Sequence, residues 1–186
     1  MGARPQVRAS PGNRSRTTMP ESRDPTRATS VLFVCLGNIC RSPLAEGVFT
    51  HLVREAGKEA IYRADSAGTG HWHVGEPPDP RSVGVAERHG IALSGVARQV
   101  DPGDFRSFDR IVAMDRENLR ELRRISPKGE GTGLLSLLRE FDLEAEGELS
   151  VPDPYYGGPE GFENVFAMVY RSCARLLEDL EAERAQ

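Results

Sequence analysis

Short apolar runs alternate with longer apolar repeats along this chain from about residue 30 onward. The run from Val31 to Val34 is continuous and is followed by a glycine-containing loop, which predicts a buried central strand. A helical repeat comes next and should end near Ala56, with Ser42 suited to cap it and Pro43 to its first turn. The apolar positions of this helix are Leu44, Val48 and Leu52.

The same two periodicities continue to the end of the chain. They predict strands over Ile61–Ser66, 97–100, Arg110–Met114 and Leu134–Leu138, and helices over Pro80–His89, Asp115–Arg124 and Glu160–Glu183. The Gly, Pro and His-rich segment from Gly68 to Pro80 should be a long loop. Strands that alternate with helices indicate an α/β fold with a parallel sheet covered on both faces, so ligands should bind at the carboxyl ends of the strands.

Charge is unevenly distributed between the beginning of the chain and the rest. Residues 1–29 contain six arginines and two acidic residues, a net +4, so the overall charge of −4 leaves −8 on residues 30–186. The first segment is rich in Pro, Gly, Ser and Arg without apolar periodicity, which predicts a disordered extension over 1–29 and a folded domain over 30–183. An organellar transit peptide is the alternative interpretation of the extension.

Composition excludes several classes of function. An acidic body argues against nucleic acid as the main partner, because such binding depends on cationic patches. Three cysteines at Cys35, Cys40 and Cys173 are too few for a disulfide scaffold, and no apolar run approaches the length of a membrane span. We therefore expect a cytoplasmic protein in a reducing compartment, with Cys173 packed in the core of the final helix.

The loop between the first strand and the first helix carries the strongest chemical signal. Residues 35–42, the Cys35 loop, read Cys-Leu-Gly-Asn-Ile-Cys-Arg-Ser, a C-x5-R-S pattern. A loop that wraps onto a helix N-terminus directs backbone N–H groups at one anion, and Gly37 and Asn38 tolerate the required curl. Arg41 can add a bidentate clamp, and Cys35 should be held as a nucleophilic thiolate that the hydroxyl of Ser42 steadies.

A second loop near the end of the chain offers a general acid. Asp153 lies between two prolines in Val-Pro-Asp-Pro-Tyr-Tyr-Gly-Gly, so it is a candidate to protonate a leaving group, although a turn aspartate capping the next helix is the structural alternative. Tyr155 and Tyr156 beside it are suited to form pocket walls. The histidines flanking Trp72 are weak metal ligands without a partner cluster.

Four segments together identify a family. VLFVCLGNICRSPLAE, DSAGTGHWHVGEPPDPR, AMDRENL and DPYYGG occur in this order, and the chain from about Val31 to Leu180 resembles the low molecular weight protein tyrosine phosphatases. The resemblance implies a single-domain three-layer sandwich with a four-stranded parallel sheet, to which 97–100 adds a short extra strand. It also implies hydrolysis of phosphotyrosine or a small aryl phosphate, inhibition by phosphate-like oxyanions, and no metal or organic cofactor.

The resemblance assigns roles to individual residues. Cys35 would be the nucleophile, Arg41 the phosphate clamp, Asp153 the general acid and then base, and Leu36, Gly37, Asn38, Ile39, Cys40 and Ser42 the rest of the phosphate-binding loop. Leu36, Trp72, Tyr155 and Tyr156 would line the aryl pocket. Cys40 falls where this family can form a reversible disulfide with the nucleophile, which would protect Cys35 from overoxidation. A small buried filler is the alternative for Cys40.

Three other functions compete with this interpretation. Arsenate reductases share a similar loop, but their redox relay needs further cysteines and none occurs between Cys40 and Cys173. Arginine phosphatases of the same fold tend to have a small polar residue where Ile39 lies and a less aromatic acid loop. A phosphate-binding or redox-sensing module would keep Cys35 and Cys40 but would not require Asp153.

Overall fold

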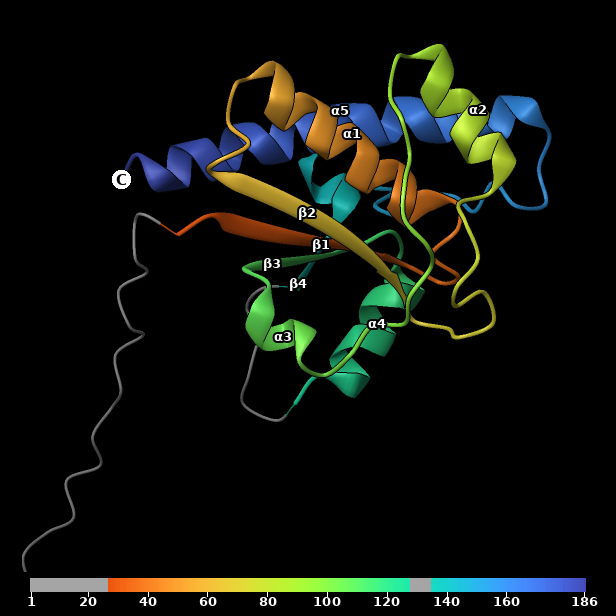
Figure 1. The fold of residues 1–186 in the computed structure, drawn as a ribbon, viewed down its shortest axis with the longest axis horizontal. Helices are drawn as coiled ribbons and strands as arrows, with labels where there is room; N and C mark the ends of the chain where they lie inside the picture. Colours follow the sequence, from red (N-terminus) through yellow and green to blue (C-terminus); the bar gives the residue numbers. More distant parts are fainter. Residues whose placement is uncertain (1–26, 128–134) are drawn as a thin grey trace, which may run out of the picture.

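A parallel sheet forms the middle layer of the protein in the computed structural model, which describes residues 27–127 and 135–186 (Figure 1). Within these residues the sheet has four strands in the order β2-β1-β3-β4. They are β1 (Thr29–Cys35), β2 (Tyr62–Gly68), β3 (Arg110–Ala113) and β4 (Leu135–Leu137). Each neighbouring pair is parallel, as the alternation of strands and helices predicts.

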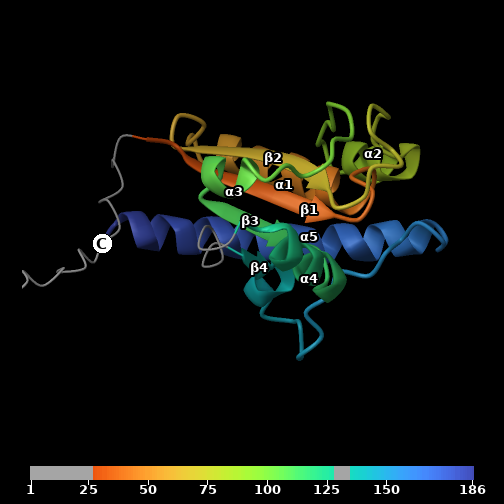
Figure 2. The same ribbon diagram turned by 90° about the horizontal axis from the view of Figure 1, so that it is seen from below.

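Helices cover both faces of the sheet (Figures 1 and 2). One side carries α1 (Arg41–Glu55), α2 (Pro80–Arg88) and the long α5 (Pro159–Arg184). The other side carries α3 (Asp104–Ser107) and α4 (Arg116–Ile125), and the short η2 (Leu138–Phe141) follows β4. The prediction of a three-layer α/β sandwich is therefore confirmed.

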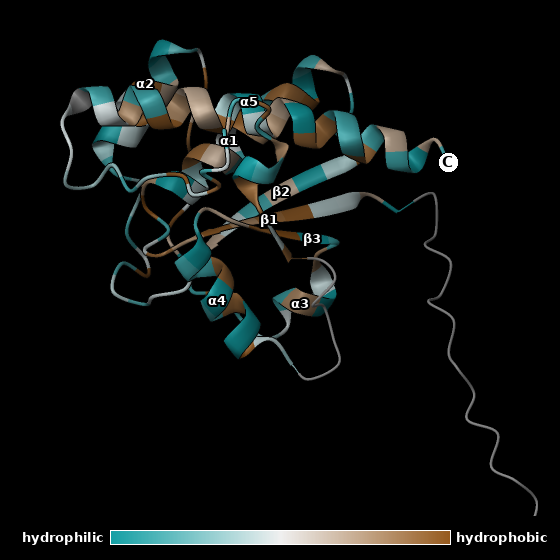
Figure 3. Ribbon diagram, turned by 180° about the vertical axis from the view of Figure 1, so that it is seen from behind, coloured by the Kyte–Doolittle hydropathy of each residue, from teal (hydrophilic) through white to brown (hydrophobic). Residues whose placement is uncertain are grey.

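The apolar run of β1 is continuous because both of its faces are buried. Val31 and Phe33 belong to the core under α1 and α5, whereas Leu32 and Val34 belong to the core under α3 and α4. Successive side chains of a strand point to opposite faces, so a central strand needs apolar residues at every position. Figure 3 shows this strand in the hydrophobic colour between the two helical layers. Cys173 lies fully buried in the first core, as predicted.

The first helix begins two residues earlier than predicted, since Ser42 as its cap would have made Pro43 the first helical residue. Arg41 is its first residue, and Cys40 precedes it without a side-chain capping hydrogen bond. The prediction that Ser42 caps this helix is wrong, because the hydroxyl of Ser42 lies inside the first turn against the sulfur of Cys35. The hydroxyl of Ser42 therefore contacts the Cys35 loop and does not cap the N-terminus of α1.

The short strand predicted over 97–100 reduces to one isolated bridge, between Gly68 and Gln99. Its backbone makes few ladder bonds because the N–H of Arg98 donates to the side-chain oxygen of Asn38 instead of to a strand. The segment therefore extends the end of β2 by single hydrogen bonds, Gly68 N–H to Arg98 O and Val100 N–H to Gly68 O.

Other parts of the structure also differ from the predicted elements. Leu134 lies outside the described residues, and Leu138, predicted as strand, begins η2. The four-residue α3 was not predicted because it is shorter than one apolar repeat. The disorder predicted over 1–29 falls mostly outside the described residues, but Thr29 already belongs to β1 and Arg27 forms an ion pair with Asp109.

No helix in the described part of the chain combines the length and apolar character that crossing a membrane requires.

A buried ion pair cluster beside η2 should make the fold sensitive to acid. Burial alone would raise the pKa of Asp142, but hydrogen bonds from Arg171, from the backbone N–H of Glu144 and from Arg139 outweigh it and lower the pKa. The Asp142 carboxylate therefore stabilises the fold above the unfolded-state pKa of roughly 3.9, and this contribution is lost as the pH falls through the folded-state pKa.

Asp142→Asn is expected to lower the free energy of unfolding at pH 7 by about 3 kcal/mol, because it leaves the buried Arg139 and the partly exposed Arg171 without their shared counter-charge. Urea denaturation at a series of pH values measures this, and the gap between wild type and variant should shrink below about pH 4. Asp179→Asn, which breaks an exposed pair with Arg175 on α5, is the control and should cost less than about 1 kcal/mol. A gap independent of pH would contradict the assignment.

Candidate active site

The Cys35 loop leaves the carboxyl end of β1 and packs against the end of β2. Cys35 is in register with Gly68, and the carbonyls of Cys35 and Leu36 accept hydrogen bonds from Thr69 N–H and Gly70 N–H at 2.9 and 2.8 Å. A Cβ at Gly68 would lie 2.8 Å from the carbonyl oxygen of Leu36. Glycine is therefore needed at this position for the loop to approach the strand so closely.

Two polar groups contact the sulfur of Cys35. The backbone N–H of Asn38 donates to Sγ at 3.2 Å, and the hydroxyl oxygen of Ser42 lies 3.0 Å from Sγ. Ser42 Oγ also accepts from Asn38 Nδ2 at 2.9 Å, which leaves its single hydrogen for the sulfur or for the carbonyl of Ala67 at 3.3 Å. These contacts fix the position of the Cys35 sulfur at the start of the loop.

Asn38 is the centre of the polar network beneath the loop. Its φ of 56° is left-handed, a conformation that asparagine tolerates better than most residues. Its amide is fully used, because Nδ2 donates to the hydroxyls of Ser42 and Ser66 and Oδ1 accepts from the N–H of Arg98. The three partners fix both the orientation of the amide and the curl of the loop.

The network continues to residues that the sequence did not indicate. Ser66 on β2 donates to Glu46 Oε2 at 2.7 Å, so a carboxylate on α1 anchors the hydroxyl that contacts Asn38. Burial raises the pKa of Glu46, whereas the hydrogen bond from Ser66 opposes this shift. Both residues occur in the quoted motifs, but nothing in their local pattern distinguishes them from surface residues.

Arg41 is buried and held by three oxygen acceptors. Its Nη1 donates to Asp115 Oδ2 at 2.7 Å and to the carbonyl of Val151 at 3.0 Å, while Nη2 donates to Asp153 Oδ2 at 3.1 Å. Burial by itself would lower the pKa of Arg41, but the negative charges of Cys35, Asp153 and Asp115 outweigh it and raise the pKa. The guanidinium therefore stays charged beside the nucleophile.

Asp115 has two structural functions that sequence reasoning missed. Its Oδ1 accepts from Asn118 N–H and caps α4, and its Oδ2 orients Arg41. The available signal was its position. It lies two residues after the end of β3, and the carboxyl ends of parallel strands meet at one edge of the sheet. Because β1 neighbours β3 in the sheet, this edge also carries the Cys35 loop.

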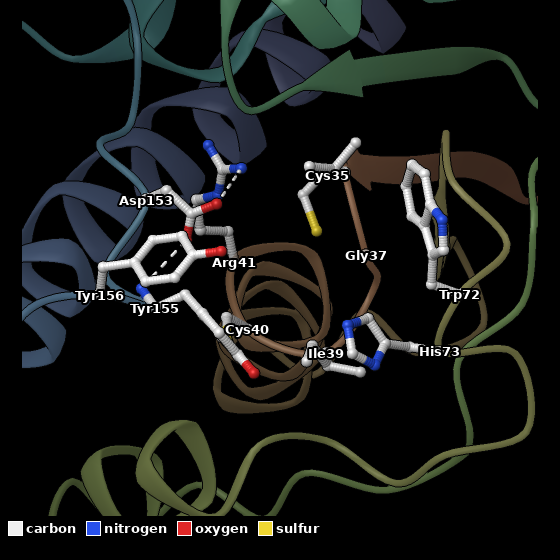
Figure 4. A pocket seen from close by; sticks show the side chains of 11 residues that line it. Cys35, Gly37, Ile39, Cys40, Arg41, Trp72, His73, Asp153, Tyr155 and Tyr156 are labelled. Carbon is white, nitrogen blue, oxygen red and sulfur yellow. Dashed lines mark hydrogen bonds and ion pairs between the residues drawn. The ribbon is translucent and has the colours of Figure 1, made fainter.

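A pocket of about 200 Å³ opens over the Cys35 loop. Figure 4 shows Cys35 between two groups of side chains, with Asp153, Tyr155 and Tyr156 on one side and Trp72 and His73 on the other. Its lining contains Cys35, Leu36, Gly37, Ile39, Cys40, Arg41, Trp72, His73, Asp153, Tyr155 and Tyr156. The four predicted pocket walls, Leu36, Trp72, Tyr155 and Tyr156, therefore surround the predicted nucleophile, clamp and acid.

The two histidines beside Trp72 have different positions. His71 stacks on Trp72, with ring centroids 5.3 Å apart, and does not line the pocket. His73 does line it, and its Nδ1 lies 2.7 Å from Glu76 Oε2. Its ring packs so close to Gly37 that a Cβ there would lie 2.9 Å away. No group of three or more His, Cys, Asp or Glu side chains is arranged to hold a metal ion within residues 27–127 and 135–186.

Cys40 is chemically unlike Cys35, although both thiols are free and buried. Burial, together with the nearby charges of Asp79 and Cys35, raises the pKa of Cys40 to about 12. Cys40 therefore remains a neutral thiol at physiological pH. A disulfide between it and Cys35 stays a prediction.

Comparison with known proteins agrees with this geometry. Residues 30–186 match the family model described as low molecular weight phosphotyrosine protein phosphatase. A low molecular weight protein-tyrosine-phosphatase of Streptomyces coelicolor is 49% identical over 148 residues, which cover 79% of this chain and 90% of that protein. The crystal structure of an Entamoeba histolytica protein tyrosine phosphatase with Hepes in its active site superposes with a TM-score of 0.81 at 36% identity, covering 84% and 99% of the two chains.

A Drosophila arginine phosphatase is also similar, with a TM-score of 0.76, 35% identity, and coverage of 81% of this chain and 97% of that one. The fold is therefore shared by enzymes named for different phosphorylated residues. The fold alone does not determine the substrate, which depends on the residues of the pocket. The family model, the curated relative and the polar loop around Cys35 all lead to one assignment: this chain belongs to the low molecular weight phosphotyrosine protein phosphatase family.

Proposed function

We propose that this protein hydrolyses phosphotyrosine through a cysteinyl-phosphate intermediate, with Cys35 as nucleophile, Arg41 as phosphate clamp and Asp153 as general acid and base. The observation that carries the proposal is the pocket itself. A sulfur that accepts a hydrogen bond from Asn38 N–H lies at its floor, and a charged arginine and a carboxylate lie beside that sulfur. These are the three groups that phosphoryl transfer to a thiolate requires.

Phosphate binding would use the loop and half of the guanidinium. The Cys35 loop leads directly into α1, whose N-terminal dipole and backbone N–H groups favour a dianion. Arg41 Nη1 is anchored by Asp115 and the carbonyl of Val151, so Nη2 is the end that exchanges Asp153 for a phosphate oxygen. This exchange frees the Asp153 carboxyl to face the leaving group.

The reaction then proceeds in two steps, formation and hydrolysis of the phosphoenzyme. The Cys35 sulfur attacks phosphorus, the bond from phosphorus to the tyrosine oxygen breaks, and Asp153 gives its proton to that oxygen. Asp153 next takes a proton from water, whose oxygen attacks phosphorus as the bond to sulfur breaks. Ser42, 3.0 Å from the sulfur, stabilises the departing thiolate by donating its hydrogen, and phosphate leaves.

The walls of the pocket favour an aryl phosphate. Trp72 and Tyr156 are 65% and 94% exposed, so most of each ring is available to contact a substrate ring. Ile39 adds an apolar floor where an arginine phosphatase tends to have a small polar residue. A phosphorylated tyrosine offers a flat apolar ring to these surfaces, whereas a phosphorylated guanidinium would lose polar contacts there.

Two other functions fit the molecule less well. Arsenate reduction needs a relay of thiols, but Cys173 is fully buried on α5 and Cys40 is held as a neutral thiol. A binding or redox-sensing module has no need of Asp153 within 3.1 Å of the phosphate clamp. We further propose that phosphate-like oxyanions inhibit the enzyme by occupying the Cys35 loop, and that it works in the reducing cytoplasm, where the Cys35 sulfur stays reduced.

Activity on a phosphotyrosine peptide, compared at equal concentration with phosphoarginine and with arsenate reduction, tests the proposal. Phosphate release from the phosphotyrosine peptide is expected to be the fastest of the three reactions. Faster turnover of phosphoarginine would replace the substrate assignment but keep the mechanism. Thiol-dependent arsenate reduction without phosphatase activity would overturn both.

Asp153→Asn is expected to lower kcat/KM for phenyl phosphate by about 10²-fold, the lower end of what a general acid contributes. The effect should be much smaller for 4-nitrophenyl phosphate, because its leaving group needs less help from a proton. Steady-state kinetics with the two esters measures the difference. Asp101→Asn, an exposed aspartate near α3, serves as the control. An equal loss on both esters would remove Asp153 from the role of acid.

A further inference from the structure

We propose that Arg81, at the start of α2, is a positioning residue that holds the Asp153 loop (residues 153–156) against the Cys35 loop. The inference rests on the proposed function, because it assigns Arg81 an effect on the general acid. Arg81 belongs to neither loop, and it lies more than seventy residues before Asp153 in the sequence. Its side chain bridges the two loops in the folded protein.

On one side, Arg81 contacts the Asp153 loop through both its charge and its planar face. Nη1 donates to the carbonyl oxygen of Tyr155 at 2.9 Å. The guanidinium carbon lies 5.2 Å from the ring centroid of Tyr155 and 4.7 Å from that of Phe162, the first of which is a pocket wall. Both distances fall in the range of cation–π attraction.

On the other side, Arg81 is tied to the Cys35 loop through Asp79. Nε and Nη2 donate to the two carboxylate oxygens of Asp79 at 3.0 and 2.8 Å, the fork geometry that arginine forms and lysine does not. The backbone N–H of Asp79 donates to the carbonyl of Ile39 at 2.7 Å. Hydrogen bonds from Arg81 are the largest cause that lowers the pKa of Asp79, and a hydrogen bond from the Cys40 thiol also contributes.

The Asp153 loop needs such a support because little regular structure holds it. Residues 151–158 contain no helix or strand, and the side chain of Asp153 is 41% exposed. Its carboxylate is oriented by Tyr155 N–H at 3.1 Å and by Arg41 Nη2 at 3.1 Å. When a phosphate group takes Arg41 Nη2, the contact of Arg81 with Tyr155 remains to hold the loop in register with the nucleophile.

Leaving-group dependence separates this role from a merely structural one. Arg81→Met keeps an apolar stem but removes the fork, the bond to Tyr155 and the cation–π contacts. We expect kcat/KM for phenyl phosphate to fall about tenfold, a fraction of the full contribution of a general acid, with at most about a twofold change for 4-nitrophenyl phosphate. Arg81→Lys keeps the charge without the fork and should give an intermediate loss on phenyl phosphate.

A matched control lies on the same helix. Arg88 is also exposed, and it contacts Glu163 and the carbonyl of Gly84 but no residue of the Asp153 loop. Arg88→Met should leave both esters unaffected, and its thermal unfolding midpoint gives the reference for Arg81→Met. In an Asp153→Asn background, Arg81→Met should produce no further loss on phenyl phosphate, because its effect acts through the acid.

The outcomes are distinguishable from those of the proposed function. Wild-type protein without aryl phosphatase activity would overturn the function and this inference together. An active wild type with Arg81→Met equal to Arg88→Met would overturn the inference alone, as would an equal loss on both esters or a loss that persists in the Asp153→Asn background. If Arg81→Met does not fold, the comparison of Arg81→Lys with wild type decides by the same criteria.

Discussion

Cys35→Ser is expected to lower kcat/KM on an aryl phosphate by at least about 10⁴-fold, because a serine hydroxyl without a general base is a far weaker nucleophile than a thiolate. Two hydrogen-bonding groups hold the sulfur in place, with Asn38 N–H at 3.2 Å and Ser42 Oγ at 3.0 Å from it. Among the described residues, no histidine forms a hydrogen bond with this sulfur. None is therefore placed to take a proton from a serine hydroxyl at the same position. Steady-state kinetics on 4-nitrophenyl phosphate measures the loss.

Binding data show whether this loss comes from the nucleophile or from damage to the loop. Cys35→Ser should still bind tungstate, a tetrahedral oxyanion, in isothermal titration calorimetry, because the backbone N–H groups and Arg41 are unchanged. Cys173→Ala, a change of thiol far from the pocket in the core of α5, should keep the activity while lowering stability. Substantial turnover by Cys35→Ser would overturn the covalent mechanism.

Arg41→Met is expected to lower kcat/KM by at least about 10³-fold, the scale seen when an arginine that stabilises a transferring phosphoryl group is lost. Arg41 and Cys35 line the same pocket, and Asp115 and Val151 O hold the guanidinium in one orientation. Removing it also leaves Asp115 and Asp153 without their shared cation. Both ground-state and transition-state contacts to phosphate would be lost, so KM should rise as kcat falls.

Arg41→Lys tests whether charge alone is sufficient. A lysine ammonium is a compact donor and cannot contact Asp115, Val151 O and a phosphate oxygen in the planar arrangement of a guanidinium. Compared with Arg41→Met, Arg41→Lys should recover part of the tungstate binding. It should recover less than a tenth of the kcat that Arg41→Met loses. Thermal unfolding of both variants, compared with wild type, controls for stability. Activity of Arg41→Lys near that of wild type would show that the planar guanidinium is not needed and that a positive charge is sufficient.

Most of the architecture and the identity of the loop followed from local patterns. The β1 run is apolar at every position because a central strand is buried on both faces, and the helix after it repeats at 3.6 residues because one face packs on the sheet. The C-x5-R-S spacing predicts an anion site because a curled loop between a strand and a helix N-terminus directs its backbone N–H groups at one anion. These features depend on neighbours in sequence, so one sequence determines them.

Most partners of the site residues were decided by tertiary structure. The contact of Ser42 with the Cys35 sulfur was predicted, but the same serine was also expected to cap α1 and does not. Asp115 reaches Arg41 from beyond the end of β3, and Asn38 binds Ser66 on β2. The strand predicted over 97–100 gives way because Arg98 N–H bonds to Asn38. Arg81 joins two loops that its own helix does not contain. Such contacts depend on strand order, register and the direction of each side chain after packing, and a local pattern carries no information about residues tens of positions away.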